Sequence, residues 1–434
     1  MALPASSTGP ERQPTPARGA PSAAGDIPSW RERTLYVLLF LMPIAGMSVR
    51  HWISGTFLLL TLFSLPELWR RPWHLTRAER TLLAVLATYF AVFVATSLAH
   101  GWSELQTHYL GREMRFLAAV PIYLAFRRLP NAGLWLMRGG LIGAVFVFAQ
   151  AMYDVKVLGL PHARGVYSHT LLGPYAAMLA VFALVSWHIE RPGSWWRRLI
   201  PVAALLAVLA MFLSASRGAL LGLLGMIFAW AALKLRGWRL VAAPIAVIAL
   251  LVAGYFVVPP FKDRLDIAAK EIVSLARGEG PVQTAGGHFL LQSVSGHVEI
   301  WRAALMIIRD HPIVGVGAGG YNGAARRYVE EGRAHPEAVR HGHSHSAYLE
   351  AMVSKGAFGL AALLVMLGVP LYVFIRDSLS SAVATLGVVH VVGFSLFSLP
   401  DASTIIKGNY IAIWLVYLTA FFAWQMRAAC ARIS

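Results

Sequence analysis

The sequence predicts an all-α polytopic membrane protein with about twelve transmembrane helices, and three observations support that prediction. Of the 434 residues, 57% are hydrophobic and 14% are charged, against roughly 45–50% and about 25% in ordinary soluble domains. Apolar runs of near-membrane length recur along almost the whole chain. Positive residues gather in short clusters between these runs, as in sequences that encode membrane orientation. The formal charge of +17 therefore has a membrane explanation, and no nucleic-acid partner is expected.

Hydropathy divides the chain into four parts. Residues 1–28 are rich in Pro, Ala, Gly and Ser and predict a disordered cytoplasmic tail without the apolar region of a signal peptide. Residues 29–258 hold the first nine spans, 259–345 form a large loop, and 346–434 hold the last three spans and a short cytoplasmic tail. The single cysteine, Cys430, excludes an intramolecular disulfide.

Twelve apolar spans are predicted. They are 34–49, 52–66, 80–99, 114–126, 135–153, 170–187, 199–214, 218–235, 240–258, 357–375, 382–398 and 409–425. The fourth is the weakest, because it is short and lies between arginines that are expected to snorkel toward the membrane surface. These are Arg112, Arg115, Arg127 and Arg128.

The distribution of Lys and Arg supports this count. With the N-terminus inside, the predicted cytoplasmic segments carry 20 Lys and Arg residues, and the short loops on the other side carry 7. Those seven are Arg50, Arg112, Arg115, Lys156, Arg164, Arg217 and Lys407. The asymmetry predicts that both termini are cytoplasmic and that the large loop is extracytoplasmic.

The large loop is where chemistry is expected. Its 87 residues carry 10 Lys and Arg, 9 Asp and Glu, and seven of the fifteen histidines. Residues 262–275 predict an amphipathic helix and 277–296 a mobile stretch. A second helix is predicted at 298–309, with Ser295 as its N-cap and Pro312 beyond its end. Its expected apolar stripe is Ile300, Trp301, Ala304, Leu305 and Ile308.

A glycine-rich string follows the second loop helix. Gly315-Val-Gly-Ala-Gly-Gly320 matches the dinucleotide fingerprint in form, but it follows a helix and a proline, and no βαβ pattern surrounds it. A turn that lets loop helices approach the membrane closely is the better interpretation.

Three residues are the main candidates for a site. Arg217 lies in a very short turn between two apolar spans, where a partner or snorkelling must accommodate its charge. Arg302 lies on the second loop helix, and His345 lies where the loop meets the membrane. Possible secondary residues are His343, Arg340 and Tyr348. The spacing of His341, His343 and His345 matches no strong zinc pattern, so no metal site is expected.

Three motifs carry a resemblance to a known family. They are Ser-Arg217-Gly-Ala, the run from Trp301-Arg302 to Gly315-Val-Gly, and His345-Ser346 followed after nine residues by Gly356-x-x-Gly359. Together they resemble the O-antigen ligase and polymerase superfamily, from about the seventh span to the end. One departure is His297, since many relatives carry an arginine just before the helix that contains the tryptophan.

The resemblance implies an activity. Such ligases transfer a polysaccharide from undecaprenyl pyrophosphate to lipid A–core oligosaccharide at the periplasmic face of the inner membrane. Their fold is that of C-type glycosyltransferases, and they invert the anomeric carbon without a metal or other cofactor. By this resemblance, Arg217 and Arg302 are expected to hold the pyrophosphate, because the arginine fork binds phosphate oxygens bidentately. His345 is expected either to accept the proton of the acceptor hydroxyl as a neutral base or to act on the donor as a cation.

Other functions remain open from sequence. An O-antigen polymerase or a protein O-oligosaccharyltransferase uses the same donor. A lipid-linked oligosaccharide flippase is less favoured, because a transporter is expected to carry ionisable residues at mid-membrane, and here His390 is the clearest one. A scaffold protein does not account for three clusters of Arg and His predicted on one face.

Overall fold

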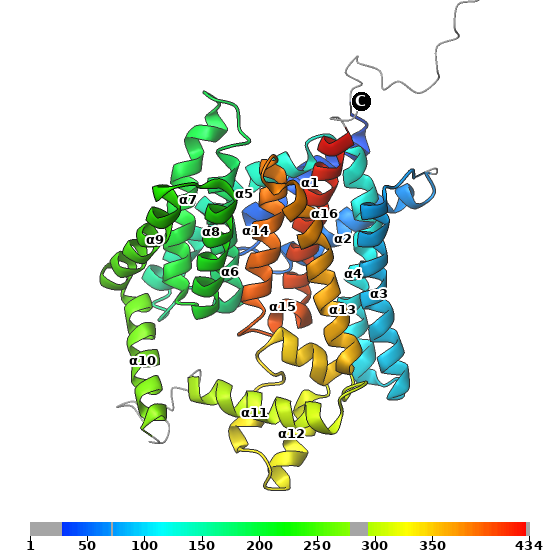
Figure 1. Ribbon diagram of the computed structural model, residues 1–434, viewed down its shortest axis with the longest axis vertical. Coiled ribbons are helices and arrows are strands. Elements are labelled where there is room, and N and C mark those ends of the chain that lie inside the picture. Colours follow the sequence, from blue (N-terminus) through cyan, green and yellow to red (C-terminus); the bar gives the residue numbers. More distant parts are fainter. Residues whose placement is uncertain (1–27, 71–72, 278–293, 431–434) are drawn as a thin grey trace, which may run out of the picture.

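The computed structural model describes residues 28–70, 73–277 and 294–430, and in these residues every regular element is helical. Two predictions fall largely outside the described residues: the disordered tail at 1–28 and the mobile stretch at 277–296. The rest of the chain forms a helical bundle with a smaller helical unit at one end (Figure 1). The prediction of an all-α membrane protein is confirmed.

Within the described residues, twelve helices make up the bundle, and each overlaps one predicted span. They are α1 (Trp30–Ala45), α2 (Trp52–Ser64), α3 (Arg77–Ala99), α4 (Glu104–Arg128), α5 (Ala132–Met152), α6 (His169–Ser186), α7 (Trp195–Ser214), α8 (Arg217–Lys234), α9 (Trp238–Val257), α13 (Ala347–Ser378), α14 (Ala382–Phe397) and α16 (Gly408–Cys430). Short turns η1 (Leu65–Leu68) and η2 (Tyr153–Val157) extend α2 and α5. In the described part of the chain, eight helices are long and apolar enough to cross a membrane; α1, α2, α4 and α14 are not among them. Twelve crossings therefore stay a prediction.

The weak fourth span is a complete helix. Ser103 and Gln106 form a capping box at the start of α4, which then runs for 25 residues. Its arginines also bond to neighbouring groups of the protein, and their snorkelling toward the membrane surface stays a prediction. Arg112 donates to the carbonyl oxygen of Ile406 at 3.0 Å and Arg115 to that of Gly111 at 2.7 Å. Near the other end, Arg127 pairs with Glu79 and Arg128 with Glu67.

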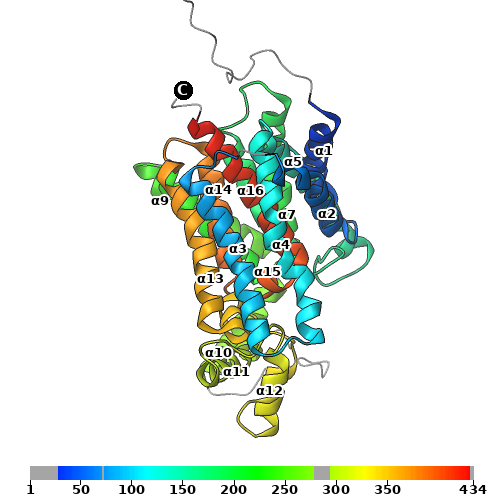
Figure 2. The ribbon, with the colours of Figure 1, turned by 90° about the vertical axis from the view of Figure 1, so that its right-hand side faces the viewer.

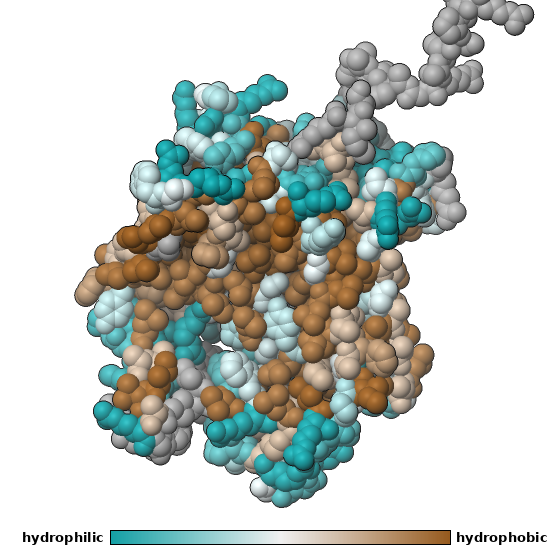
Figure 3. All heavy atoms as spheres, viewed as in Figure 1, coloured by the Kyte–Doolittle hydropathy of each residue, from teal (hydrophilic) through white to brown (hydrophobic). Residues whose placement is uncertain are grey.

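The centre of the bundle is occupied by α6 and α16, whose apolar windows are each 83% buried, whereas that of α9 is 12% buried. Large side chains of α16 fill the core, among them Trp414, Tyr417 and Phe421. The surface shows a hydrophobic band between two hydrophilic ends (Figure 3). A band of this kind is expected where lipid chains surround the helices.

The two ends of the bundle differ in what they carry. Arg427 of α16 donates to the carbonyl oxygen of Arg127 at 2.9 Å, so the end of α16 lies beside the end of α4. The start of α1 lies at this same end, whereas α10 (Pro259–Ala276), α11 (Val294–Asp310) and α12 (Tyr321–Glu330) lie at the opposite end (Figures 1 and 2). This arrangement agrees with an even number of crossings. Which end faces the cytoplasm stays a prediction.

The smaller unit has its own core. Buried residues of α11, α12 and the turn η3 (Pro336–Val339) pack together with Val353 of α13. The amphipathic helix predicted at 262–275 is present as α10. The prediction for α11 is wrong in two details: the helix begins at Val294, ahead of Ser295, and Leu305 is 56% exposed. Its buried positions are Ile300, Ala303, Ala304 and Ile307.

The glycine-rich string forms the predicted close approach. Gly315 has φ +70°, and a Cβ atom there would lie 2.4 Å from the carbonyl oxygen of Val353. Next to it, the amide of Val316 donates to that same oxygen at 2.8 Å. No strand is present among the described residues, so the dinucleotide interpretation is excluded.

Candidate functional site

A cavity of about 590 Å³ lies between the bundle and the smaller unit. Its walls come from α6, α8, α10, α11 and α16, from the loop before α6, from the turn that precedes α13, and from the segment around α15 (Ser403–Ile406). The face seen in Figure 3 is hollowed between α10 and α11, at the lower edge of the apolar band. The cavity is therefore at the level where a membrane surface meets the extramembrane unit.

Four histidines form one side of the cavity. The ring centroid of His345 lies 4.4 Å from those of His341 and His343 and 4.8 Å from that of His297. His345 has φ +52°, and this left-handed conformation helps to turn the chain sharply before α13. Its Nε2 atom is buried and has no hydrogen-bond partner among the described residues. This nitrogen is available to a bound molecule.

The pKa values of three of these histidines are lowered. Burial is the largest cause, and nearby imidazoles and Lys407 add to it, so that the pKa of His345 falls to about 2. Burial together with Lys407 lowers the pKa of His343 to about 4, and burial together with Arg340 lowers that of His341. Neutral imidazoles can accept a proton, which protonated ones cannot.

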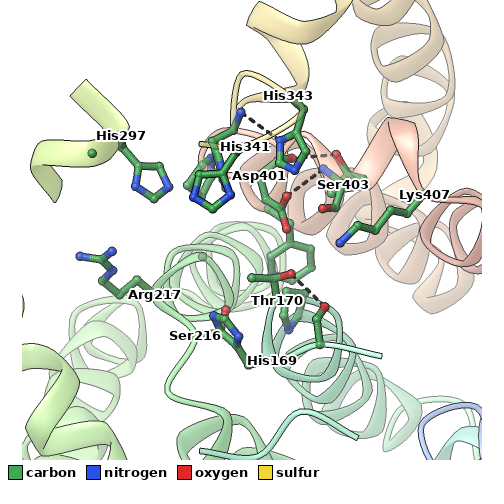
Figure 4. Close-up of a pocket in the computed structure, with 18 of the residues that line it drawn as sticks. His169, Thr170, Ser216, Arg217, His297, His341, His343, Asp401, Ser403 and Lys407 are labelled. Atoms are coloured by element: carbon green, nitrogen blue, oxygen red, sulfur yellow. Dashed lines mark hydrogen bonds between the residues drawn. The ribbon is translucent and has the colours of Figure 1, made fainter. Parts of the chain in front are cut away.

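Basic side chains form the other walls. Arg217 is the first residue of α8, directly after Ser216, whose side chain accepts from the amide of Ala219 and caps the helix. Arg264 comes from α10, and its pKa is lowered by burial and then by the charge of Arg217. Lys407 comes from the segment before α16. In Figure 4, Arg217 and Lys407 lie on opposite sides of the space below His297, His341 and His343.

One carboxyl group is held among these bases. The Oδ1 atom of Asp401 accepts from the amide of Ser403 at 2.8 Å, and Asp401 lines the cavity beside Thr170 and Lys407 (Figure 4). Burial raises the pKa of this carboxyl group. A carboxyl group with a raised pKa beside cations is a candidate for binding a sugar hydroxyl or for moving a proton.

The charge of the cavity is unbalanced. Among its lining residues are four cationic side chains, six histidines and two carboxylates, Glu337 and Asp401. The cationic residues are Arg164, Arg217, Arg264 and Lys407, and the histidines are His162, His169, His297, His341, His343 and His345. A cavity with this excess suits a phosphorylated ligand. Among the described residues, no three His, Cys, Asp or Glu side chains are arranged to bind a metal ion.

The structure brings together some of the residues singled out from sequence. Arg217, His343 and His345 line the cavity, but Arg302, Arg340 and Tyr348 do not. Arg302 has a side chain that is 67% exposed and pairs with Glu299 on its own helix at 2.5 Å. Arg340 pairs with Glu337 at 3.7 Å, and the hydroxyl of Tyr348 donates to the carbonyl oxygen of Ser395 at 3.0 Å.

Several lining residues were missed from sequence. Arg264, Asp401, His162 and His169 carried no motif, and His297 was noted only as a departure from the family pattern. For Arg164 and Lys407 a signal existed: with Arg217, they are three of the seven basic residues on the side that the positive-inside rule leaves poor in charge. Basic residues on the side that this rule leaves poor in charge are therefore candidates for ligand binding.

Fold and site together define an all-α membrane protein with a basic, histidine-rich cavity at one end of its bundle. Residues 202–364, which include Arg217, Arg264 and the four clustered histidines, match the family model described as O-antigen ligase. This match supports membership of the O-antigen ligase superfamily and points to a membrane enzyme of the O-antigen ligase and polymerase type. It is also similar to an uncharacterized protein of Haemophilus influenzae, with 25% identity over 290 residues, which is 64% of this chain and 70% of that protein.

Proposed function

We propose that this protein is an O-antigen ligase: a glycosyltransferase that transfers polysaccharide from undecaprenyl pyrophosphate to lipid A–core oligosaccharide. The observation that carries the proposal is the cavity, where cationic side chains face neutral imidazoles at the edge of the apolar band. Both substrates are anchored in lipid, so an enzyme with its cavity at this level meets their head groups by lateral diffusion. The same proposal includes twelve crossings, a C-type glycosyltransferase fold, a location in the inner membrane, cytoplasmic termini and a periplasmic cavity.

The pyrophosphate is held, in this proposal, by Arg217 and Arg264 with Lys407 on the opposite side. The bond between the anomeric carbon and the pyrophosphate oxygen breaks, and undecaprenyl pyrophosphate leaves with the electron pair. Pyrophosphate is already a good leaving group, so it needs positive charge more than a general acid. Arginine supplies a permanent charge and a fork that fits two phosphate oxygens. We leave Arg302 out of the clamp because its guanidinium group is exposed outside the cavity.

His345 is the proposed general base. The acceptor hydroxyl attacks the anomeric carbon from the face opposite the leaving group, and its proton passes to Nε2 of His345. The lowered pKa keeps the imidazole of His345 neutral in the free protein but also makes it a weak base, and the negative charge of a bound pyrophosphate raises its pKa by favouring the imidazolium form. The unpartnered Nε2 supports contact with a substrate hydroxyl. Attack from the opposite face inverts the anomeric carbon, and no step requires a metal or cofactor.

The decisive experiment offers one donor to three acceptors. The full-length protein in lipid nanodiscs receives undecaprenyl-pyrophosphate-linked glycan with lipid A–core, with a second donor molecule, or with a protein. Glycosylated lipid A–core is the expected product. Elongated donor would instead identify a polymerase, and glycosylated protein would identify an O-oligosaccharyltransferase. In sealed proteoliposomes, movement of intact donor across the bilayer without transfer would support a flippase.

Orientation needs a separate test. A cysteine at exposed position His335, in a Cys430→Ser background, is expected to react with an impermeant thiol reagent in intact spheroplasts. The unchanged protein, with Cys430 at the opposite end of the bundle, is the matched control and is expected to stay unlabelled until the membrane is opened. The reverse labelling pattern would place the cavity in the cytoplasm and contradict the proposal.

A further inference from the structure

An ion pair is buried between α4 and α13, behind the histidine side of the cavity. The Nζ atom of Lys355 lies 2.6 Å from Oε1 of Glu113, and the two side chains are 4% and 5% exposed. Lys355 also lies over the rings of Tyr89 and Phe93, with its Nζ atom 4.5 and 5.6 Å from their centroids. Neither charge lines the cavity. Burying two charges costs desolvation free energy that their attraction often only offsets, so a role in fixing geometry deserves a test.

The pair lies at a break in α13. Gly356 has φ +63° and ψ −157°, so residues 347–355 form a half-helix that does not continue into the rest of α13. The loop enters this break: the amide of Ala357 donates to the carbonyl oxygen of Pro312 at 2.9 Å, and a Cβ atom on Gly356 would lie 2.0 Å from the carbonyl oxygen of Ile313. Because the helix ladder is interrupted here, other contacts must set the position of the half-helix. The ion pair is next to the break and supplies one of them.

The half-helix carries the histidine turn at its other end. Oε2 of Glu350 accepts from the amide of Ser344 at 2.8 Å, which holds the residue before His345 to the half-helix. Nine helical residues span about 13 Å. A short helix moves as a rigid rod, so a displacement at Lys355 is transmitted to His345.

The other wall is tied to the same helix of the bundle. Arg112, the neighbour of Glu113 on α4, donates to the carbonyl oxygen of Ile406 at 3.0 Å, directly before Lys407. Adjacent residues of α4 thus contact the element that carries His345 and the one that carries Lys407. The distance between these two walls is fixed through α4.

We infer that Lys355 and Glu113 are positioning residues: their ion pair holds the half-helix of α13 so that His345 meets the acceptor hydroxyl. This inference rests on the proposed function. It expects a separation of effects, because Arg217 and Arg264 lie on α8 and α10, away from the half-helix, and the segment of Lys407 keeps its own contact with α4 through Arg112 when the ion pair is lost. Loss of the pair lowers kcat and leaves the KM for the donor unchanged.

The test replaces both charges at once. In Lys355→Met/Glu113→Leu neither member of the pair is left buried without the other, and Glu350, which also lies within the influence of Lys355, keeps its bond from the amide of Ser344, so the protein is expected to fold. Purified in nanodiscs, it is expected to keep its unfolding midpoint and its donor KM within about threefold, while kcat falls about 100-fold, as for a small misplacement of a reacting group. The matched control is Arg138→Met/Glu190→Leu, which removes a largely buried pair at the opposite end and is expected to keep wild-type kcat.

A second variant, with a smaller change, keeps the test valid if the double variant misfolds. Glu113→Asp keeps the charge but withdraws the carboxylate by one methylene group, and kcat is expected to fall about tenfold with donor KM unchanged. Wild-type kcat in either variant would overturn the inference alone, as would a parallel rise in donor KM. If the wild-type protein transfers glycan to none of the three acceptors, the proposed function fails, and the inference fails with it.

Discussion

Arginines at the two ends of the bundle have different surroundings. At the end that carries the termini, four arginines contact two buried carboxylates directly: Glu67 contacts Arg31, Arg70 and Arg128, and Glu190 accepts from Arg138. At the other end, cationic side chains border a cavity of about 590 Å³, and buried Glu271 of α10 adds a negative charge near Arg217 and Arg264. Arginines packed against carboxylates between helices hold those helices together, whereas cations that border a cavity can also bind an anionic ligand. Contact with the cavity, and not the number of nearby carboxylates, therefore distinguishes the ligand-binding arginines in this chain.

The largest expected effect is at the histidine side of the cavity. His345→Ala removes the proposed base, and transfer is expected to fall by about 10²–10⁴-fold, the usual contribution of general-base catalysis. The measurement is initial rate with lipid A–core as acceptor, at matched protein levels in the membrane. His341→Ala is the control and is expected to lose less than about tenfold. Full activity of His345→Ala would remove this residue from the mechanism.

The next effect contrasts two arginines at the same end. Arg217→Lys keeps a charge in the cavity but loses the fork, so kcat/KM for the donor is expected to fall at least about tenfold. Arg302→Lys is expected to stay within about twofold, because this side chain is exposed and pairs with Glu299. Equal loss in both variants would restore the clamp of Arg217 and Arg302 that the sequence suggested. Equal tolerance would show that neither arginine binds the donor through its fork.

This contrast also shows what the sequence could and could not predict. The positions of the helices followed from hydropathy, since an apolar run of nearly membrane length has few alternatives to a helix. The helical period placed Arg302 on a face of α11, but the choice of the docked face depends on how Ile300, Ala303 and Ala304 pack against α12 and α13. Tertiary packing therefore selects the docked face of α11, and the helical period alone does not reveal it.

The sequence could predict a site residue where the neighbouring helices allowed its side chain only one location. Arg217 lies between two apolar helices with almost no loop, and His345 starts the helix that re-enters the bundle, so both had to face the boundary. Arg264 is one of 10 basic residues in the large loop, and nothing in its neighbours distinguishes it. Asp401 accepts from the amide of Ser403, as any turn-forming aspartate does. Their approach to the cavity depends on contacts between distant segments.

A smaller effect is expected at the opposite end. Arg138→Gln leaves Glu190 buried without its partner, which is expected to lower the free energy of unfolding by roughly 1–3 kcal/mol while the kcat of the folded protein stays within about twofold. Thermal unfolding in detergent and activity per folded molecule measure the two quantities separately. Arg80→Gln, at an exposed position on α3, is the control for stability. A tenfold fall in kcat for Arg138→Gln would contradict the assignment of this ion pair to stability alone.

The smallest expected effect is that of pH. Because the pKa of His345 is depressed to about 2, the imidazole is neutral above about pH 4, and a base in this state stays competent as pH rises. The described neighbours His343 and His341 also have lowered pKa values, which favours their neutral forms near neutrality. The value of kcat/KM, which reports groups of the free enzyme, is therefore expected to change less than about twofold between pH 6 and pH 8.

The profile separates the two roles of His345. A catalytic imidazolium would make kcat/KM fall as pH rises through its pKa, and this fall would disappear in a residually active His345→Gln variant. Asp401 is the other group to control, because burial raises its pKa toward the range measured. A rise in kcat/KM with pH that persists in His345→Gln but is lost in Asp401→Asn belongs to that carboxyl group. A fall that is lost only in His345→Gln would contradict the neutral base and assign His345 to the donor.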